Sequence, residues 1–124
     1  MFSQFKRALI IDDLRNLKPK ALPSHLHIDT ARNSQDAIAL LKSHTYDLIF
    51  WDHDLGGDDT SRKVAMYLLE EAMDNENFPP LFNVIHTDNP VGGEWLEGTL
   101  NSRFFTQNKT MRVSSDQFFV AEQV

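Results

Sequence analysis

The fold of this chain is decided by the stretch Tyr46-Asp47-Leu48-Ile49-Phe50-Trp51-Asp52-His53-Asp54-Leu55-Gly56-Gly57-Asp58-Asp59. Its unbroken apolar run at 48–51 predicts a strand that is covered on both faces. The run stops at Asp52-His53-Asp54, and Gly56-Gly57 turns the chain before a helix. Carboxylates and an imidazole therefore lie just after the carboxyl end of a buried strand.

The charges in this stretch are mostly of one sign. Two carboxylates about 4 Å apart repel by roughly 4 kcal/mol at an effective dielectric near 20. A fold retains such a group when a cation or a proton compensates it, and the alternative is a solvated loop whose carboxylates point apart. A second apolar run, Ala8 to Ile11, also ends on acids, Asp12-Asp13. This second acidic strand end favours a compensated cluster.

Composition limits the classes of protein to consider. A chain of 124 residues with 41% hydrophobic content predicts one globular domain that spans 1–124, large enough for a sheet with helices on both faces. The net charge of -6 argues against unaided binding to a nucleic-acid backbone. The absence of cysteine excludes disulfides, thiol nucleophiles and thiolate metal sites. Neither a signal-peptide core nor an apolar run of membrane-spanning length is present, so we expect a soluble, cytoplasmic protein that does not bind membranes.

Hydrophobic patterning predicts the order of the strands and loops. We expect strands at 8–11, 27–31, 48–51, 81–85 and 110–113, of which 27–31 is an edge strand because it alternates polar and apolar residues. Residues 16–26 contain Pro19 and Pro23 and show no helical period, which predicts mostly loop.

Helices are expected between these strands. The first is capped by Asn33 or Ser34 and ends near Ser43-His44, and the second runs from 61 to 73 after a cap at Asp59 or Thr60. Further helices are expected at 94–103 and 115–123. Alternating strands and helices predict an α/β fold with a doubly wound, mainly parallel five-stranded sheet.

Ligands of such sheets bind beyond the carboxyl ends of the strands, at the topological switch point. Three strand ends converge there: Asp12-Asp13, Asp52-His53-Asp54 and His86-Thr87. This convergence is the main structural expectation for the site.

The pattern resembles the receiver domain of two-component response regulators. An acidic pair (Asp12 and Asp13) ends strand one, Asp52 ends strand three and the hydroxyl residue Thr87 ends strand four. The resemblance implies strand order 2-1-3-4-5, a magnesium ion held by the acids and a phosphoryl group accepted by the strand-three aspartate. Receivers also carry a lysine at the end of strand five, whereas Lys109 precedes the last expected strand here. Asp52 is therefore expected to be a poor phosphoacceptor.

A second departure from receivers is the loop at 16–26 in place of a regular first helix. Three motifs, Asp12-Asp13-x-Arg15, Asp52-His53-Asp54-Leu55-Gly56 and His86-Thr87-x-Asn89-Pro90-x-Gly92, together resemble the receiver-like family described as processing cyclic phosphates. That resemblance implies a metal-dependent hydrolase, a phosphoesterase acting on cyclic phosphate ends or cyclic nucleotide derivatives.

Residue chemistry suggests roles beside the resemblance. Carboxylate oxygens suit Mg²⁺ or Mn²⁺, and the expected metal ligands are Asp12, Asp13, Asp52 and Asp54. His53 and His86 are candidate general base and general acid because their unperturbed pKa values lie near neutrality, and Asp52 is counted with them as catalytic. The expected substrate-binding residues are Arg15, Thr87, Asn89 and Gly92, the last through the amino-terminal amides of a helix that Gly92-Gly93 opens.

Each of these roles has a structural alternative. His53 would neutralise its two acidic neighbours, His86 would be a hydrogen-bonded structural histidine, and Arg15 would form a salt bridge with Asp12 or Asp54. The expected ligand is a small phosphorylated or cyclic-phosphate compound. The rival function is a stand-alone, non-catalytic receiver-like module that binds a protein partner, and a third is a phosphorylated switch with Asp52 as the acceptor.

Overall fold

A computed structural model describes residues 2–120 of the chain. The strands are β1 (Arg7–Ile11), β2 (Asn16–Leu17), β3 (His27–Ala31), β4 (Leu48–Trp51), β5 (Phe82–Ile85), β6 (Lys109–Arg112) and β7 (Phe119–Val120). The helices are α1 (Ser34–Ser43), α2 (Arg62–Asp74), α3 (Pro90–Leu100) and a short 3₁₀ helix, η1 (Ser115–Gln117). None of the helices in the described range is both long and apolar enough to cross a membrane.

Five strands form one parallel sheet in the order β3-β1-β4-β5-β6, which confirms the α/β class and the expected receiver order. Ile11 of β1 pairs with Trp51 of β4, and Trp51 pairs with Ile85 of β5. The next residues along these strands continue the ladder, because the amide of Asp52 donates to Ile11 at 2.9 Å and that of His86 donates to Trp51 at 3.0 Å. The register therefore brings three predicted site residues, one from each strand end, to the same level.

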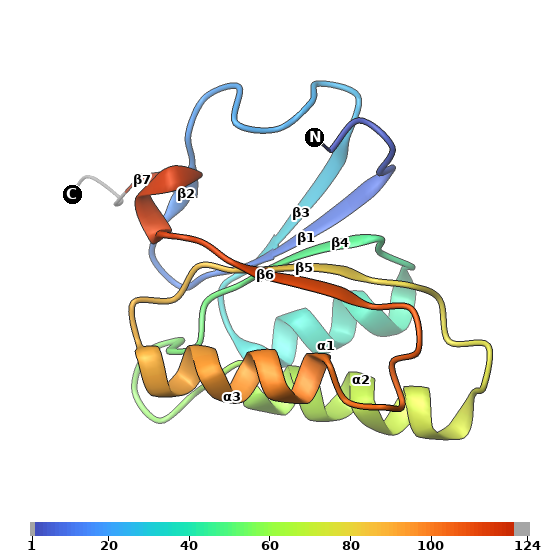
Figure 1. The fold of residues 1–124 in the computed structure, drawn as a ribbon. Helices are drawn as coiled ribbons and strands as arrows, with labels where there is room; N and C mark the ends of the chain where they lie inside the picture. The colour runs from blue at the N-terminus through green and yellow to red at the C-terminus, as the bar shows by residue number, and fades with distance from the viewer. Residues whose placement is uncertain (1, 121–124) are drawn as a thin grey trace.

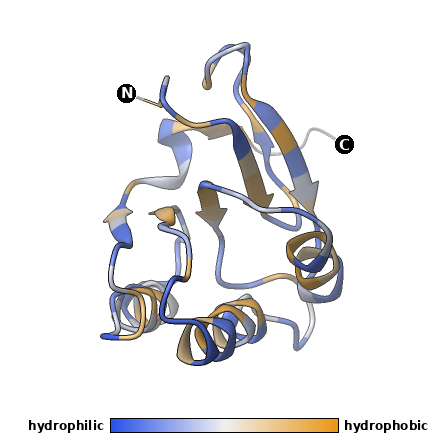
Figure 2. Ribbon diagram, turned by 90° about the vertical axis from the view of Figure 1, so that its right-hand side faces the viewer, coloured by the Kyte–Doolittle hydropathy of each residue, from blue (hydrophilic) through white to orange (hydrophobic). Residues whose placement is uncertain are grey.

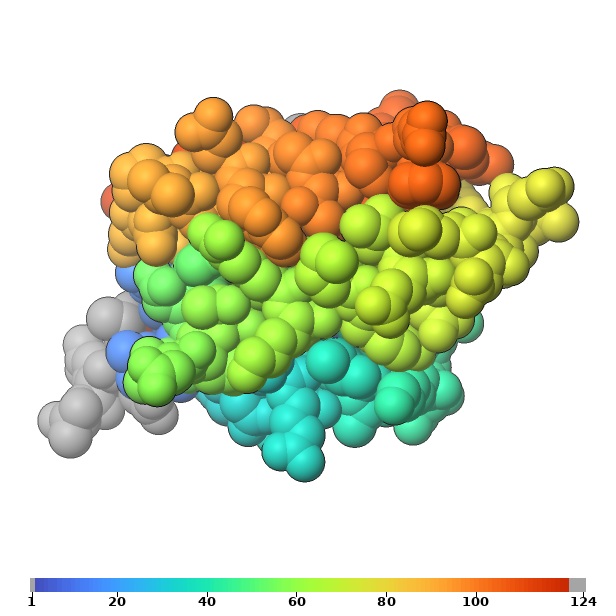
Figure 3. Space-filling view, turned by 90° about the horizontal axis from the view of Figure 1, so that it is seen from below, coloured from blue at the N-terminus to red at the C-terminus, as the bar shows by residue number. Residues whose placement is uncertain are grey.

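All three α-helices lie on one face of the sheet (Figure 1), and they pack side by side over that face (Figure 3). The central strands consist mostly of hydrophobic residues (Figure 2), and all four residues of β4 are buried. The second face packs against aromatic and aliphatic side chains from the two chain ends and the 16–26 loop, among them Phe2, Leu26, Phe118 and Phe119. The sequence predicted helices on both faces, but the proline-containing loop and residues near the two chain ends cover this face instead.

Two helix starts differ from their predictions. Helix α3 begins at Pro90 rather than 94, because Asn89 accepts a hydrogen bond from the amide of Gly92 and Pro90 occupies the first turn. Helix α2 begins at Arg62 after Ser61, which makes no side-chain cap. Asp59, the predicted cap, instead accepts hydrogen bonds from the amide and the hydroxyl of Ser34, at 2.8 and 2.6 Å.

The carboxyl-terminal segment also differs from its prediction. The expected helix at 115–123 is the short η1 followed by β7, and its residues 121–123 lie outside the described range. β7 pairs antiparallel with β2, within the stretch predicted as loop. Burial of Phe118 and Phe119 against the second sheet face favours this path over a free amphipathic helix.

Gly92 and Gly98 of helix α3 provide a matched test of packing. A Cβ at Gly92 would lie 2.3 Å from Cγ of His53, whereas a Cβ at Gly98 would meet nothing within 4 Å. Gly98→Ala should stabilise the domain by roughly 0.5–1 kcal/mol through helix propensity. Gly92→Ala should destabilise it by about 1–3 kcal/mol because His53 must move. Urea unfolding of both variants checks this, and equal effects would contradict this packing of His53 against α3.

Candidate functional site

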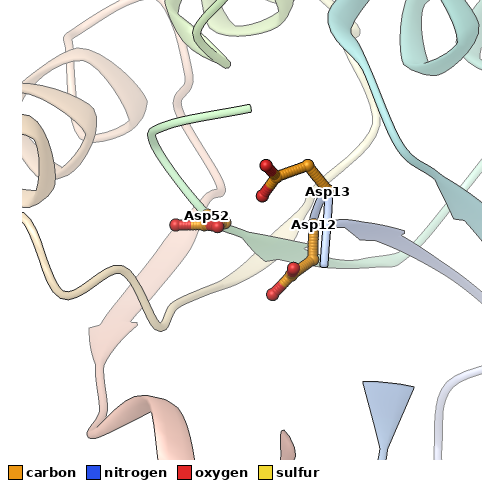
Figure 4. Close-up of side chains that lie close together, drawn as sticks. All are labelled: Asp12, Asp13 and Asp52. Atoms are coloured by element: carbon orange, nitrogen blue, oxygen red, sulfur yellow. The ribbon is translucent and has the colours of Figure 1, made fainter. Parts of the chain in front are cut away.

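Three carboxylates gather at the carboxyl edge of the sheet. Asp12 and Asp13 follow β1 and Asp52 follows β4, and each offers an oxygen within 4.8 Å of the others (Figure 4). Asp12 is fully buried, Asp52 is 7% exposed and Asp13 is half-buried. We call these three residues the acid cluster.

Asp12 is held from both sides. Its Oδ1 accepts the amides of Leu14 and Arg15 at 2.9 and 2.7 Å, and its Oδ2 lies 3.0 Å from Nε2 of His86. Burial acts to raise the pKa of Asp12, but the hydrogen bonds from His86 and from the two amides hold that pKa below its usual value. Asp12 is therefore ionised at neutral pH.

The pKa of Asp52 is shifted in the opposite direction. Burial, followed by the negative charge of Asp12, raises the pKa of Asp52 to about 7. Burial also raises the pKa of Asp13. The acid cluster is thus short of positive charge, and its hard oxygen donors fit a divalent cation such as Mg²⁺ or Mn²⁺.

A cavity of about 990 Å³ opens above the acid cluster. Among the predicted site residues, its lining includes Asp12, Asp13, Arg15, Asp52, Asp54, Thr87 and Asn89. Arg15 is ion-paired with Asp88, and its Nη1 lies 3.9 Å from Oδ2 of Asp12. A guanidinium thus borders a cavity that is otherwise rich in acids.

Two residues that were predicted to bind phosphate instead accept hydrogen bonds from backbone amides in the loop after β5 and at the start of α3. Oγ1 of Thr87 accepts the amide of Asn89 at 3.2 Å, and Oδ1 of Asn89 accepts the amide of Gly92 at 3.0 Å. Gly92 is buried inside the first turn of α3, so it does not open the helix as predicted. Its amide already has an acceptor and is not offered to the cavity.

Asp54 lines the cavity but lies outside the acid cluster. Its Oδ1 lies 2.9 Å from Nδ1 of His53, and its Oδ2 accepts Nδ2 of Asn89 at 3.1 Å. The hydrogen bond with His53, first among several contacts, lowers the pKa of Asp54. Asp54 therefore joins the loops after β4 and β5.

His53 is enclosed rather than open to the cavity. Nε2 accepts Nε of Arg62 at 2.8 Å, so the proton lies on Nδ1, which donates to Asp54. The ring is 5% exposed and packs against Gly92. Both ring nitrogens are engaged, and the neutral ring hydrogen-bonds one acidic neighbour, Asp54, without neutralising either of the two.

His86 lies beneath the acid cluster with no exposed surface. Its ring stacks on Phe119 at 4.1 Å between centroids, and burial lowers its pKa despite the contact with Asp12. A neutral ring donates Nε2–H to Asp12, and Nδ1 has no partner among the described residues. His86 is not part of the cavity lining and acts on the position of Asp12.

One residue that lines the cavity, Asp88, and one cation near it, Arg112, were not predicted from the sequence. Asp88 pairs with Arg15, and its place directly after Thr87 was the available signal. Arg112 is the last residue of β6, and its guanidinium lies 2.8 Å from the position that a Cβ of Gly93 would take, beside the methyl group of Thr87. A search for lysine alone overlooked Arg112, whereas Lys109 is at the opposite end of β6.

The raised pKa of Asp52 predicts a pH-dependent stability. A carboxyl whose folded pKa exceeds its unfolded value stabilises the fold below the unfolded pKa of 3.8, and this contribution is lost as pH rises to about 7. The ionised side chain then costs on the order of 4 kcal/mol. Asp52→Asn should therefore raise the stability of the metal-free domain near pH 8, with little change near pH 4. Thermal unfolding between these pH values measures the difference in stability between Asp52→Asn and the wild type. A difference that does not change with pH would refute the raised pKa of Asp52.

A comparison with protein families agrees with this geometry. The model of the cyclic-phosphate processing receiver domain matches residues 7–102, a segment that runs from β1 through α3 and contains all the predicted site residues. No curated protein matches the chain. The match covers well over half of the sequence, and the sheet has the receiver strand order. The chain therefore belongs to the family of cyclic-phosphate processing receiver domains.

Proposed function

We propose that this domain is a metal-dependent phosphoesterase that hydrolyses cyclic phosphates, either at cyclic phosphate ends or in cyclic nucleotide derivatives. The observation that carries the proposal is the acid cluster at the floor of a cavity that Arg15 borders. Oxygen ligands, an adjacent guanidinium and room for a small ligand together suit a phosphate ester. Family membership supports the same substrate class.

The acid cluster is the proposed ligand set for Mg²⁺ or Mn²⁺. A divalent cation there would neutralise the carboxylates, stabilise negative charge on the phosphoryl oxygens and lower the pKa of a water molecule. Asp12 is oriented for this task by His86 and by two backbone amides. Such hydrogen bonds from neighbouring groups fix the geometry of metal ligands.

Arg15 is the proposed phosphate ligand, because a guanidinium binds two phosphate oxygens at once. In hydrolysis the water oxygen bonds to phosphorus, one ester P–O bond breaks, and the leaving oxygen takes a proton. Asp54 is our candidate for orienting the attacking water by a hydrogen bond, since it lines the cavity and His53 and Asn89 orient it, and the proton that the water loses passes to the leaving oxygen. The histidines are thereby assigned positioning roles in place of the direct proton transfer that the sequence predicted.

Magnesium affinity tests the ligand set. Asp13→Asn and Asp52→Asn should each weaken Mg²⁺ binding by at least about tenfold, because each removes a charged oxygen ligand. Asp54→Asn is the matched control, since it removes the same charge from a residue that lines the cavity outside the acid cluster. Titration calorimetry measures all three. Unchanged affinity in the first two variants, or an equal loss in the control, would contradict the assignment.

Turnover tests the reaction itself. The wild type, with Mg²⁺ or Mn²⁺, should open the ring of at least one 2′,3′-cyclic or 1″,2″-cyclic phosphate, as followed by phosphorus NMR. Arg15→Lys should lower the rate by about 10²-fold, because an ammonium does not reproduce the two-point contact. Arg103→Ala is the control, since Arg103 packs on Phe104 and does not line the cavity. A rate unaffected by Arg15→Lys would remove this residue from the mechanism.

One observation favours the alternative of a non-catalytic module that binds a protein partner. Neither His53 nor His86 lines the cavity, so no imidazole of the described residues is placed to protonate a leaving oxygen. A wild type that binds Mg²⁺ but turns over none of these substrates would favour the module. Proton transfer then has no role, and the cavity is a recognition surface.

A further inference from the structure

Asp88 connects three segments around the cavity. Its Oδ2 pairs with Arg15 from the loop after β1, and its Oδ1 accepts Oγ of Ser115 at 2.8 Å. Asp88 itself belongs to the loop after β5, and Ser115 begins η1. η1 lies beyond the 7–102 segment that the family model matches. The segment η1, which lies outside the matched region, thus contacts Asp88, the ion-pair partner of Arg15.

Arg15 lies between two attractive groups. On one side is Asp88, and on the other is the acid cluster, with which Arg15 forms a longer ion pair, 3.9 Å between its Nη1 and Oδ2 of Asp12. A guanidinium and a divalent cation are both attracted to the same carboxylate oxygens. Arg15 released from Asp88 would therefore move onto the acid cluster and compete with the metal.

The backbone of Arg15 is held by hydrogen bonds, and its side chain, among the described residues, by ion pairs alone. Nη1 of Arg32 donates to the carbonyl of Arg15 at 2.7 Å and to that of Asp12 at 3.1 Å. The amide of Arg15 donates to Oδ1 of Asp12. The main chain of Arg15 is thus held at both its amide and its carbonyl. Rotation of the side chain therefore decides whether the guanidinium lies at the edge of the cavity or against the acid cluster.

We propose that Asp88 is a positioning residue that prevents Arg15 from closing its long ion pair with the acid cluster and thereby leaves the cluster accessible to a divalent cation. Ser115 stabilises the carboxylate of Asp88 in that position. This inference rests on the proposed metal site. It adds that an acid outside the ligand set promotes metal binding by restraining an internal competitor.

A double-mutant cycle tests the proposal through Mg²⁺ affinity, measured by calorimetry on the full chain. Asp88→Asn should weaken binding roughly fivefold when Arg15 is present, and by less than about twofold in the Arg15→Ala background. Asp88→Glu, which can still pair with Arg15, should bind Mg²⁺ within about twofold of the wild type. Asp58→Asn is the control, because it removes an exposed charge from the loop after β4 and should show the same small effect in both backgrounds.

Equal effects of Asp88→Asn in the two backgrounds would overturn the proposal, since through-space attraction of Mg²⁺ by Asp88 does not need Arg15. A wild type that binds no Mg²⁺ would overturn both this proposal and the metal site, whereas binding without coupling overturns this one alone. A crystal structure of metal-free Asp88→Asn gives a second measurement. A guanidinium nitrogen of Arg15 should then lie within hydrogen-bond distance of an acid-cluster oxygen, and a separation that stays near 3.9 Å would contradict the inference.

Discussion

The repulsion among Asp12, Asp13 and Asp52 is the constraint on which the rest of this site depends. Parallel pairing of β1 and β4 in register makes their ends level, so the carboxylates cannot separate without breaking the sheet. Neighbouring groups offset part of the repulsion, through the hydrogen bonds to Asp12 and the partial protonation of Asp52 that its pKa of about 7 allows at neutral pH. A divalent cation would satisfy the remaining deficit of positive charge.

The unusual second face of the sheet is linked to this site. A loop and the carboxyl-terminal segment replace helices there, and Phe119 reaches the sheet to stack on His86. His86 in turn donates to Asp12. A buried ring between an aromatic side chain and a carboxylate keeps one tautomer, so packing on this face determines the orientation of one acid in the cluster.

The same segment changes the comparison with ordinary receivers. Arg112 lies at the end of the last strand, where receivers are expected to carry a lysine, and Ser115 contacts Asp88 from η1. Arginine presents a planar fork and lysine a compact charge, so the two recognise phosphate differently. Both residues lie outside 7–102, so the carboxyl-terminal segment that contacts Asp88 is not part of the region that the family model matches.

The sequence by itself determined the sheet order, through the family resemblance, and the acids at its edge. Buried parallel strands read as continuous apolar runs, and the residues directly after each run must lie at one edge of the sheet. Only the tertiary structure decided that His53 and His86 lie behind the carboxylates that line the cavity, that Asp54 joins two loops, and that residues 119–120 form a strand rather than a helix. The periodicity that marks a strand is a local feature of the sequence. The partner of a side chain, or the pairing of a two-residue strand, depends on segments far apart in the chain, and a local pattern does not record it.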